Sequence, residues 1–376
     1  MRVLHVIDSL ALGGAERSLA ELVPALRAGG CDVHVAYLHD RPGLGPAVAE
    51  GGGVLHDLSR ARGRVGWMNA VTELIGVIRP DIVHTTLFEA DQAGRVGAWR
   101  HRRPVVSSLV SEMYGSTHRA ESMGRGARLR AAQTLDITTS RLVTRFHAVS
   151  GSVADAMAPR LRVRRDRIDV IGRGRDTTAL EAAAAGAAEM RRRFDVPDGA
   201  PLVVGVGRLA HAKGFDVLLD AVPDLLCRHP DTRVLIAGGD ADASSRLRSH
   251  PVHGAVQWCG HVDGVAALIA AADVLAFPSR REGLPGTVIE AFALGTPVVC
   301  SDIAPLRELA GTGEPTALVV PVDDPGALSV AIGRVLDGDV DVGALTRRAR
   351  ERFDAEFTIE STAARHIAQY RRVLDA

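Results

Sequence analysis

The sequence predicts an α/β fold made of two doubly wound, Rossmann-like domains, each built on an open parallel sheet. Three observations lead to this prediction. The chain has 376 residues, which exceeds one typical hydrophobic core and suits two domains. Short apolar runs alternate with longer helical patterns, as in βαβ units. This alternation pauses in an alanine-rich stretch near the middle of the chain and then starts again.

The first domain is expected over residues 1–172. Its strands are predicted in the runs RVLHVID, DVHVAYL, DIVHTT, PVVSSLV and RFHAVS, and the run RIDVIG before the domain boundary is also strand-like. Between the first two strands lies ERSLAELVPALRAGG, whose apolar residues recur at helical spacing before a glycine stop at Gly29. The start of the chain therefore predicts a strand, an amphipathic helix and a second strand.

The second domain is expected over residues 173–358, with the boundary between about Arg173 and Gly199. Its strands are predicted in PLVVGVG, RVLIAGG, VQWCG, DVLAFPS, TPVVCS and ALVVPVD. Residues 359–376 predict a terminal helix, because their pattern is helical and no strand follows. Open parallel sheets bind ligands beyond the carboxyl ends of their strands, so two facing domains would share one cleft.

Composition argues against several classes of protein. Hydrophobic residues make up 46% of the chain, which disfavours disorder. The chain contains no run of about 18 uncharged apolar residues, the length that a membrane-spanning helix needs. The opening MRVLHVIDSL lacks a small-residue cleavage site and is interpreted as a strand, not a signal peptide. Four scattered cysteines favour buried free thiols in a reducing cytoplasm. The 45 basic and 45 acidic residues cancel, which argues against a nucleic-acid partner.

The positive charges are unusual in kind and in distribution. They comprise 44 arginines and one lysine, Lys213, which indicates a codon bias toward arginine. Between Arg95 and Arg175 there are 17 arginines against 6 acidic residues. This excess has a functional interpretation, a surface for anionic lipid headgroups or for a phosphorylated acceptor. The lipid surface would place the protein peripherally at the inner face of the membrane. The alternative is a solvated face that reflects codon bias alone.

The first candidate site is the turn at Gly13 and Gly14, between the first strand and the first helix. Paired glycines permit close backbone approach, and a helix N-terminus offers unpaired N–H groups to an anion. A tight turn between strand and helix needs glycines in any case, so the structural alternative stays open. The turn lacks the G-x-G-x-x-G spacing, which disfavours an NAD-dependent dehydrogenase.

The second candidate site is the basic pair Arg208 and Lys213, in VGVGRLAHAKGFDVLLDA. Two cations five residues apart, beside a helix start, would form a socket for a diphosphate. Arg208 would donate in bidentate fashion, and Lys213 would act as a point charge. The alternative is an ordinary surface cation, but the helix macrodipole makes that position unfavourable for Lys213.

The third candidate site contains two carboxylates, Glu282 and Glu290, in PSRREGLPGTVIEAFALG. Carboxylates at the mouth of a sheet accept hydrogen bonds from the vicinal hydroxyls of a sugar or ribose. Glu290 could instead complete a capping box, Thr287-x-x-Glu290, and serve only its own helix. In VQWCGHV, the turn at Gly260 either presents Val262 to a nucleobase or simply ends a strand.

These motifs, in this order and spacing, resemble the retaining glycosyltransferases of family 4, which have the GT-B fold. The resemblance covers nearly the whole chain, including the glycine turn at Gly13, the junction VIGRGRD, the segment GRLAHAKG and the spacing Glu282-x7-Glu290. It implies two Rossmann-like domains facing across a cleft, with the C-terminal helix returning to the first domain. It also implies sugar transfer from a nucleoside-diphosphate donor to an acceptor hydroxyl of a glycan, glycolipid or secondary metabolite.

The resemblance implies a role for each candidate residue. Arg208 and Lys213 would hold the diphosphate and stabilise its departure, with no metal ion or other cofactor. Glu290 would bind the ribose, and Glu282 would bind the hydroxyls of the transferred sugar. Val262 would contact the base. The remaining donor contacts would come from the N–H groups of Gly283 and Leu284 and from the glycine turn at Gly13 and Gly14. Family members use front-face attack, in which the departing phosphate takes the acceptor proton and the anomeric configuration is retained.

Two positions depart from the family pattern. Many relatives carry a sugar-facing histidine at the end of the strand PVVSSLV, where this chain has Val110, and Glu112 or His118 would have to substitute. At the junction, Arg173 stands where asparagine is common. A sugar-nucleotide epimerase, a glycan phosphorylase and a non-catalytic nucleotide-sugar-binding partner remain alternatives, because each is compatible with two such domains.

Overall fold

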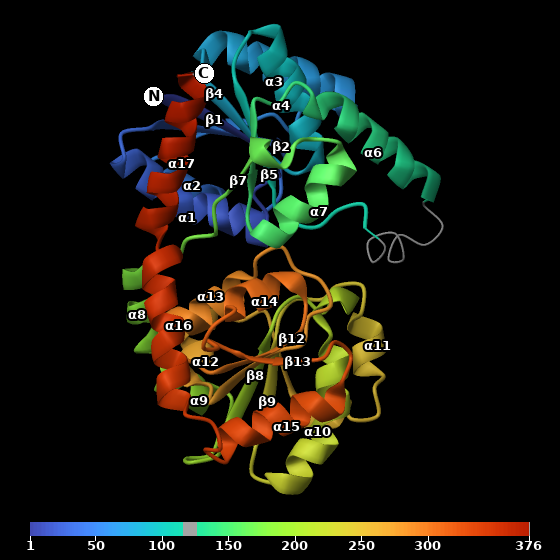
Figure 1. Cartoon of the computed structure of the whole chain (residues 1–376), viewed down its shortest axis with the longest axis vertical. Coiled ribbons are helices and arrows are strands. Elements are labelled where there is room, and N and C mark those ends of the chain that lie inside the picture. The colour runs from blue at the N-terminus through green and yellow to red at the C-terminus, as the bar shows by residue number, and fades with distance from the viewer. Residues whose placement is uncertain (116–125, 376) are drawn as a thin grey trace. The chain divides into compact units, whose positions relative to one another are not determined.

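In the computed structural model, which describes residues 1–115 and 126–375, the chain divides into two units (Figure 1). Unit 1 consists of Met1–Gly174 together with the C-terminal segment that starts at Ile359. Unit 2 consists of Arg175–Thr358. The chain thus enters unit 2 two residues beyond the expected boundary and leaves it at the expected position.

Unit 1 contains a parallel sheet with the strand order β3-β2-β1-β4-β5-β6-β7. Its strands are β1 (Arg2–Ser9), β2 (Asp32–His39), β3 (Val54–Asp57), β4 (Ile82–Thr86), β5 (Val105–Leu109), β6 (Arg145–Ala148) and β7 (Ile168–Val170). All six strand runs named in this half are present, including RIDVIG, which contains β7. The predictions omitted β3, because this short edge strand has no fully buried residue and so no apolar run.

The helices of unit 1 cover its sheet and build its core. They are α1 (Gly14–Ala28), α2 (Gly45–Glu50), α3 (Gly63–Ile78), α4 (Phe88–Arg100), α6 (Gly126–Ser140), α7 (Gly151–Leu161) and α17 (Ile359–Leu374). The C-terminal helix α17 lies beside α1 in this unit (Figure 1). Its apolar residues recur every three or four positions and enter the same core as β1 and α1: Ile359, Ala363, Ile367, Tyr370 and Val373.

Unit 2 contains a second parallel sheet, ordered β10-β9-β8-β11-β12-β13. All six strands match predicted runs: β8 (Leu202–Val206), β9 (Arg233–Ala237), β10 (Gln257–Gly260), β11 (Val274–Phe277), β12 (Val298–Ser301) and β13 (Leu318–Val320). The α-helices are α8 (Thr177–Ala184), α9 (Ala187–Arg193), α10 (Phe215–Arg228), α11 (Ser244–Arg248), α12 (Val265–Ala271), α13 (Gly286–Leu294), α14 (Ala304–Ala310), α15 (Pro325–Leu336) and α16 (Val342–Glu356).

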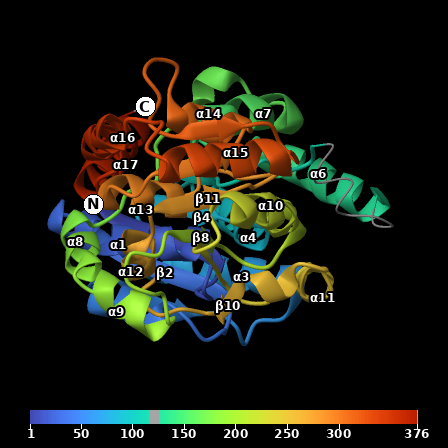
Figure 2. The same ribbon diagram turned by 90° about the horizontal axis from the view of Figure 1, so that it is seen from below.

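Helices lie on both faces of the second sheet, so unit 2 is doubly wound. In Figure 2, α15 lies on one side of β8 and β11, and α12 lies on the other. The predicted α/β fold with two Rossmann-like domains is therefore confirmed. In the described part of the chain, we find no helix that is both long and apolar enough to span a membrane.

Candidate active site

The strand order of unit 2 reverses between β8 and β11, which makes their carboxyl ends a topological switch point. From β8 the chain continues to β9 on one side, and from β11 it continues to β12 on the other. Ligands of open α/β sheets bind in the crevice at such a point. The loop after β8 carries Arg208 and Lys213, and the loop after β11 carries Glu282.

Two glycines shape the loop after β8. A short 3-10 helix, His211–Lys213, is followed by Gly214 in the left-handed conformation, with φ 66°, and then by α10. A β-carbon at Gly214 would overlap the carbonyl oxygen of Pro278, so only glycine allows the two loops to approach this closely. The stem of Lys213 lies over Gly207, where a β-carbon would lie 3.3 Å from Lys213 Cδ.

Lys213 and Glu282 form an ion pair at the switch point. The Lys213 Nζ lies 2.6 Å from the Glu282 Oε1, and the two side chains are 21% and 11% exposed. The same ammonium lies 5.3 Å from the centre of the Phe277 ring. The structure thus brings together two predicted site residues from different loops, and both remain partly accessible to a ligand.

Arg208 lies on the same loop with its side chain exposed. In the part of the chain that the structure describes, its guanidinium has no ion-pair partner. A cation that is both exposed and unpaired, three residues before the 3-10 helix, can bind an anionic ligand without first breaking an existing contact.

Arg280 links the two loops, and its role was not predicted from the sequence. Its backbone N–H donates to the Ala212 carbonyl at 2.8 Å. Its guanidinium donates to the His211 carbonyl, binds both carboxylate oxygens of Asp216 at 2.8 Å and reaches Asp323 at 2.6 Å. Burial acts to raise the pKa of Asp216, but the hydrogen bonds and charge of Arg280 outweigh it and lower that pKa. Arg280 therefore fixes the turn that carries Lys213.

Glu290 is buried in α13 and does not cap its helix. The helix begins at Gly286, with Pro285 in the N-cap position and no side-chain cap, so the capping-box alternative is wrong. Thr287 lies inside the first turn, where its hydroxyl cannot serve as the N-cap. Instead, Glu290 accepts a hydrogen bond from Arg175 at 2.8 Å.

The remaining unit 2 candidates lie in the loop after β11 and in the turn after β10. Gly283 and Leu284 are buried in the loop between Glu282 and α13, and Leu284 is only 3% exposed. Val262 follows β10 and is 6% exposed, so most of its side chain packs within the protein. Gly260 precedes it with φ 62°, which produces the predicted glycine turn.

In unit 1, the glycine turn lies at the switch point between β1 and β4. Gly13 is the N-cap of α1, and it offers no side chain to the N–H groups of the first turn. The guanidinium of Arg173 lies against Gly14, where a β-carbon would be 2.9 Å from its Nη1 atom. The junction arginine that departs from the family pattern is therefore placed beside the glycine turn.

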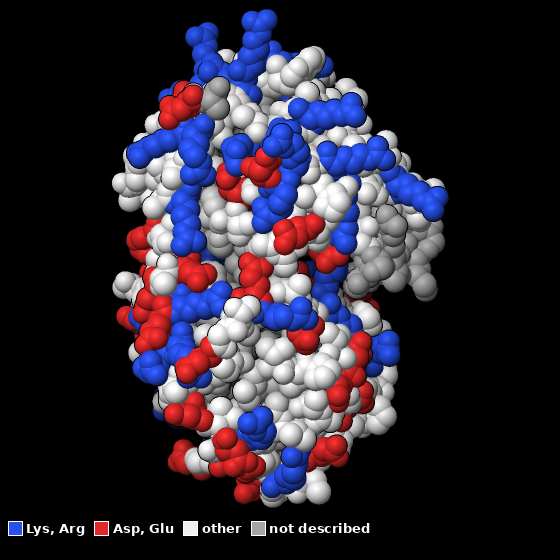
Figure 3. Space-filling model, in the orientation of Figure 1, with Lys and Arg blue, Asp and Glu red and all other residues white. Residues whose placement is uncertain are grey.

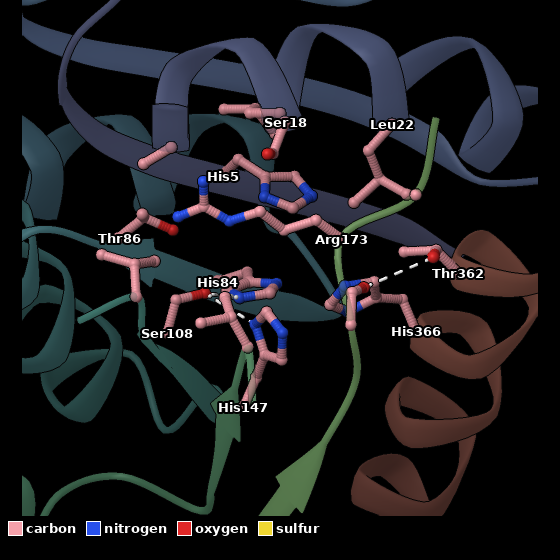
Figure 4. Close-up of a pocket in the computed structure, with 16 residues that line it drawn as sticks. His5, Ser18, Leu22, His84, Thr86, Ser108, His147, Arg173, Thr362 and His366 are labelled. Carbon is pink, nitrogen blue, oxygen red and sulfur yellow. Dashed lines mark hydrogen bonds between the residues drawn. The ribbon is translucent and has the colours of Figure 1, made fainter. Parts of the chain in front are cut away.

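A cavity of about 50 Å³ opens beside this turn (Figure 4). It is lined by Val110, the position at which many relatives carry a histidine, and by Arg173. Glu112 forms a 2.6 Å ion pair with Arg160 and is not among the residues that line this cavity. The other candidate substitute, His118, lies outside the described residues.

Four histidines also line the cavity: His5, His84, His147 and His366 (Figure 4). All four are nearly fully buried. Burial lowers the pKa of His5 to about 3 and that of His147 to about 4, and it holds the pKa values of the other two well below 6.5. The cluster is therefore neutral at pH 7.

Neutrality fixes the direction of a hydrogen-bond chain through this cluster. The Nε2 of His147 donates to the Ile171 carbonyl at 2.9 Å, so its Nδ1 must accept from the Ser108 hydroxyl at 3.0 Å. The Ser108 oxygen accepts from His84 Nε2 at 2.7 Å, and His84 Nδ1 accepts from the Tyr370 hydroxyl at 2.5 Å. Because Tyr370 belongs to α17, this chain ties the C-terminal helix to the sheet.

A cation paired with a carboxylate at the switch point of one Rossmann-like unit, in a chain that carries a second such unit, agrees with the arrangement expected of a GT-B glycosyltransferase. The comparisons specify the family. Residues 12–179 match the family model "Glycosyltransferase Family 4", and residues 200–338 match "Glycosyl transferases group 1". The chain belongs to this family and is a glycosyltransferase.

Several curated relatives are similar over different shares of the chain. The 2-deoxystreptamine N-acetyl-D-glucosaminyltransferase of Streptomyces fradiae is 31% identical over 331 residues, covering 78% of this chain and 73% of the relative. Glycogen synthase of Mycobacterium tuberculosis is 27% identical over 96% of this chain and 92% of its own length. The 2-deoxystreptamine glucosyltransferase of Streptomyces kanamyceticus is 32% identical, but the match spans only 58% of that protein and 59% of this chain.

Solved structures share the fold at lower identity. Anabaena HepE in complex with UDP-glucose has a TM-score of 0.81 and 19% identity, covering 98% of this chain and all of its own. Sucrose-phosphate synthase from Thermosynechococcus elongatus has a TM-score of 0.80 and 20% identity over the full length of both chains. The predicted GT-B architecture is therefore confirmed.

Proposed function

We propose that this enzyme transfers a sugar from a nucleoside-diphosphate donor to an acceptor hydroxyl with retention of anomeric configuration. The observation that carries the proposal is the Lys213–Glu282 pair at the switch point of unit 2. In a nucleotide sugar, the sugar is bonded directly to the diphosphate. A cation for phosphate and a carboxylate for hydroxyls must therefore lie side by side, as these two groups do. The structural neighbours described with UDP and UDP-glucose support this class of donor.

Each unit 2 residue has a role in this proposal. Donor binding would exchange the Lys213–Glu282 contact for two new ones, from Lys213 to a phosphate oxygen and from a sugar hydroxyl to Glu282. Arg208, exposed on the same loop, adds a second cation at the diphosphate. Glu290 accepts hydrogen bonds from the ribose, and Gly283, Leu284 and Val262 complete the donor site of unit 2.

The reaction follows from this arrangement. The bond between the anomeric carbon and the phosphate oxygen breaks, and a bond to the acceptor oxygen forms on the same face. The departing phosphate takes the acceptor proton, so atoms and charges balance without a protein nucleophile. Arg208 and Lys213 neutralise the charge that develops on the diphosphate, which is electrostatic stabilisation by preorganised groups. The proposal needs no metal ion.

The donor and the reaction class can be tested together. UDP-, GDP- and ADP-glucose are compared by thermal shift and by donor hydrolysis in EDTA. The acceptor 2-deoxystreptamine, which appears in the names of two relatives, is then supplied. We expect one donor to raise the Tm, to be hydrolysed slowly and to give a retained glycoside by NMR. Phosphate-dependent glycan cleavage would instead indicate a phosphorylase, and acceptor-independent isomerisation would indicate an epimerase. Binding without turnover for any acceptor would indicate a non-catalytic partner.

We further propose a cytoplasmic enzyme that associates peripherally with anionic membrane. All four cysteines are free thiols, which supports a reducing compartment. On the face of unit 1 that Figure 3 shows, basic side chains predominate over acidic ones. Each described acidic residue between Arg95 and Arg175 already has an arginine partner within that range. The remaining arginines include exposed residues that precede β5 and β6: Arg100, Arg102 and Arg141.

Membrane association is expected to depend on salt. The protein should co-sediment with vesicles containing anionic lipid at low ionic strength and dissociate as salt approaches 1 M, where the Debye length is about 3 Å. Neutral vesicles serve as the control, and a variant with Arg100, Arg102 and Arg141 replaced by glutamate should bind anionic vesicles more weakly. No sedimentation with anionic vesicles at low salt would contradict the proposed membrane association.

A further inference from the structure

Arg175, the first residue of unit 2, is buried against Glu290. Its Nε lies 2.8 Å from Glu290 Oε1, and the two side chains are only 3% and 2% exposed. Taking a carboxylate out of water is costly unless a cation and hydrogen bonds compensate for the lost hydration. Arg175 supplies both, so it balances the charge of Glu290 and holds its carboxylate in one orientation.

Arg175 is itself held at its backbone and at its side chain. Its N–H donates to the Phe357 carbonyl at 2.9 Å, and it forms a parallel bridge with Thr358. Its guanidinium lies against the backbone of Gly286, where a β-carbon would overlap it. Gly286 is the first residue of α13, so the helix that carries Glu290 begins with the residue that leaves room for Arg175.

We propose that Arg175 is a positioning residue for the ribose of the donor and acts through Glu290. The inference rests on the proposed function, in which Glu290 accepts hydrogen bonds from ribose hydroxyls. Two hydroxyls on one sugar ring require a carboxylate at a fixed angle. A carboxylate that Arg175 already holds in place binds them more tightly than a mobile one, because no side-chain entropy is lost on binding. Arg175 therefore contributes to affinity for the nucleotide without contacting it.

A comparison of ribose with dideoxyribose separates this role from general structural support. UDP, ADP and GDP are titrated calorimetrically into the wild type, and the tightest ligand is carried forward with its 2′,3′-dideoxy analogue. We expect the wild type to prefer the natural nucleotide by about 10- to 100-fold, the factor that a hydrogen bond to a charged group commonly contributes. In Arg175→Met, this preference should fall below about 3-fold while affinity for the dideoxy analogue is kept. Arg175→Lys, which retains a cation, should give an intermediate preference.

Arg350→Met is the matched control. Arg350 also supports α13, because its Nη1 donates to the Ala293 carbonyl at 3.0 Å. Its other hydrogen bonds are with Glu181 and Asp354, and its guanidinium lies over the Phe353 ring; none of these contacts involves Glu290. A variant that only weakens support of this helix should therefore keep the wild-type preference for the natural nucleotide.

The possible outcomes distinguish the inference from the function on which it rests. An Arg175→Met variant that keeps the wild-type preference overturns the inference, and so does one that binds the natural nucleotide more tightly, because Arg175 would then compete with the ribose. If Arg175→Met does not fold, an unchanged preference in Arg175→Lys overturns it in the same way. Failure of the wild type to bind UDP, ADP or GDP overturns the proposed donor site together with this inference.

Discussion

Replacing Lys213 with alanine is expected to slow sugar transfer by about 30- to 1,000-fold, equivalent to about 2–4 kcal/mol of transition-state stabilisation. The ammonium faces the position proposed for the departing diphosphate, where negative charge develops as the sugar leaves. The side chain is 21% exposed at a loop, so its loss should leave the fold intact. Steady-state transfer with the donor identified above, together with the Tm of the variant, measures both effects.

Glu282→Gln is expected to slow transfer by a similar factor for a different reason. Glu282 is assigned to the sugar hydroxyls, whereas Lys213 is assigned to the phosphates. Binding of UDP, which carries no sugar, should therefore weaken in Lys213→Ala. It should be unchanged or stronger in Glu282→Gln, because Glu282 no longer competes for the Lys213 ammonium. This opposite response cannot arise from general damage to the site.

A surface ion pair of unit 2 provides the control for these variants. Arg307 and Asp302 lie 2.8 Å apart, and their side chains are 59% and 42% exposed. Exposed pairs of this kind contribute little to stability. Arg307→Ala should therefore transfer sugar at the wild-type rate, and near wild-type transfer by both Lys213→Ala and Glu282→Gln would refute the site assignment.

Acidification is expected to destabilise unit 1 strongly below about pH 6.5, the ordinary histidine pKa. The four buried histidines stay neutral in the folded protein, because burial lowers their pKa values, but they bind protons once the chain unfolds. The unfolded state thus gains protons as the pH falls, and stability falls with it. At pH 5, each histidine lowers the free energy of unfolding by about 2 kcal/mol, and the four together lower it by up to about 8 kcal/mol.

Two buried carboxyls oppose this trend. Burial raises the pKa of Asp8 to about 6 and also raises the pKa of Asp91, so both bind protons more readily when the protein is folded. They return part of the stability that the histidines remove. The free energy of unfolding is therefore expected to fall by several kcal/mol between pH 7 and pH 5. This fall is large, because the whole free energy of unfolding of a typical protein is only about 5–15 kcal/mol.

Urea unfolding monitored at pH 8, 7, 6 and 5 measures this dependence. His366→Phe removes one titrating group whose ring nitrogen Nδ1 has no hydrogen-bond partner among the described residues. It should reduce the slope between pH 6 and 5 by about 1.4 kcal/mol per pH unit. His261, whose side chain is 61% exposed, is the control, and His261→Gln should leave the slope unchanged. A wild-type stability that stays constant from pH 7 to pH 5 would contradict the prediction.

The sequence predicted the fold well, because strands and helices leave periodic patterns. All six strands of unit 2 and six of the seven in unit 1 match runs named from the sequence, and the helix α1 buries the residues whose spacing predicted it. The edge strand β3 was omitted because it buries too little apolar surface to produce a pattern. The glycine turn, the cations and the carboxylates were singled out because each lies in a segment that follows a predicted strand.

The capping-box alternative for Glu290 shows where a local pattern misleads. Thr287 and Glu290 have the right spacing, but Pro285 takes the N-cap position and the helix starts before Thr287. The carboxylate is bound instead by Arg175, which lies 115 residues earlier in the chain. A pattern of four residues carries no information about a partner so distant.

The sequence by itself determined the family, the order of the two α/β units and the loops that carry the candidate residues. Only the tertiary structure decided which side chains meet. It pairs Lys213 with Glu282, Arg175 with Glu290, and Arg280 with Asp216. It also gathers four histidines from β1, β4, β6 and α17 around one cavity. The physical reason is that periodicity reports which face of an element is buried. Contacts between distant residues instead depend on strand order and crossover connections, which bring together groups as far apart as residues 5 and 366.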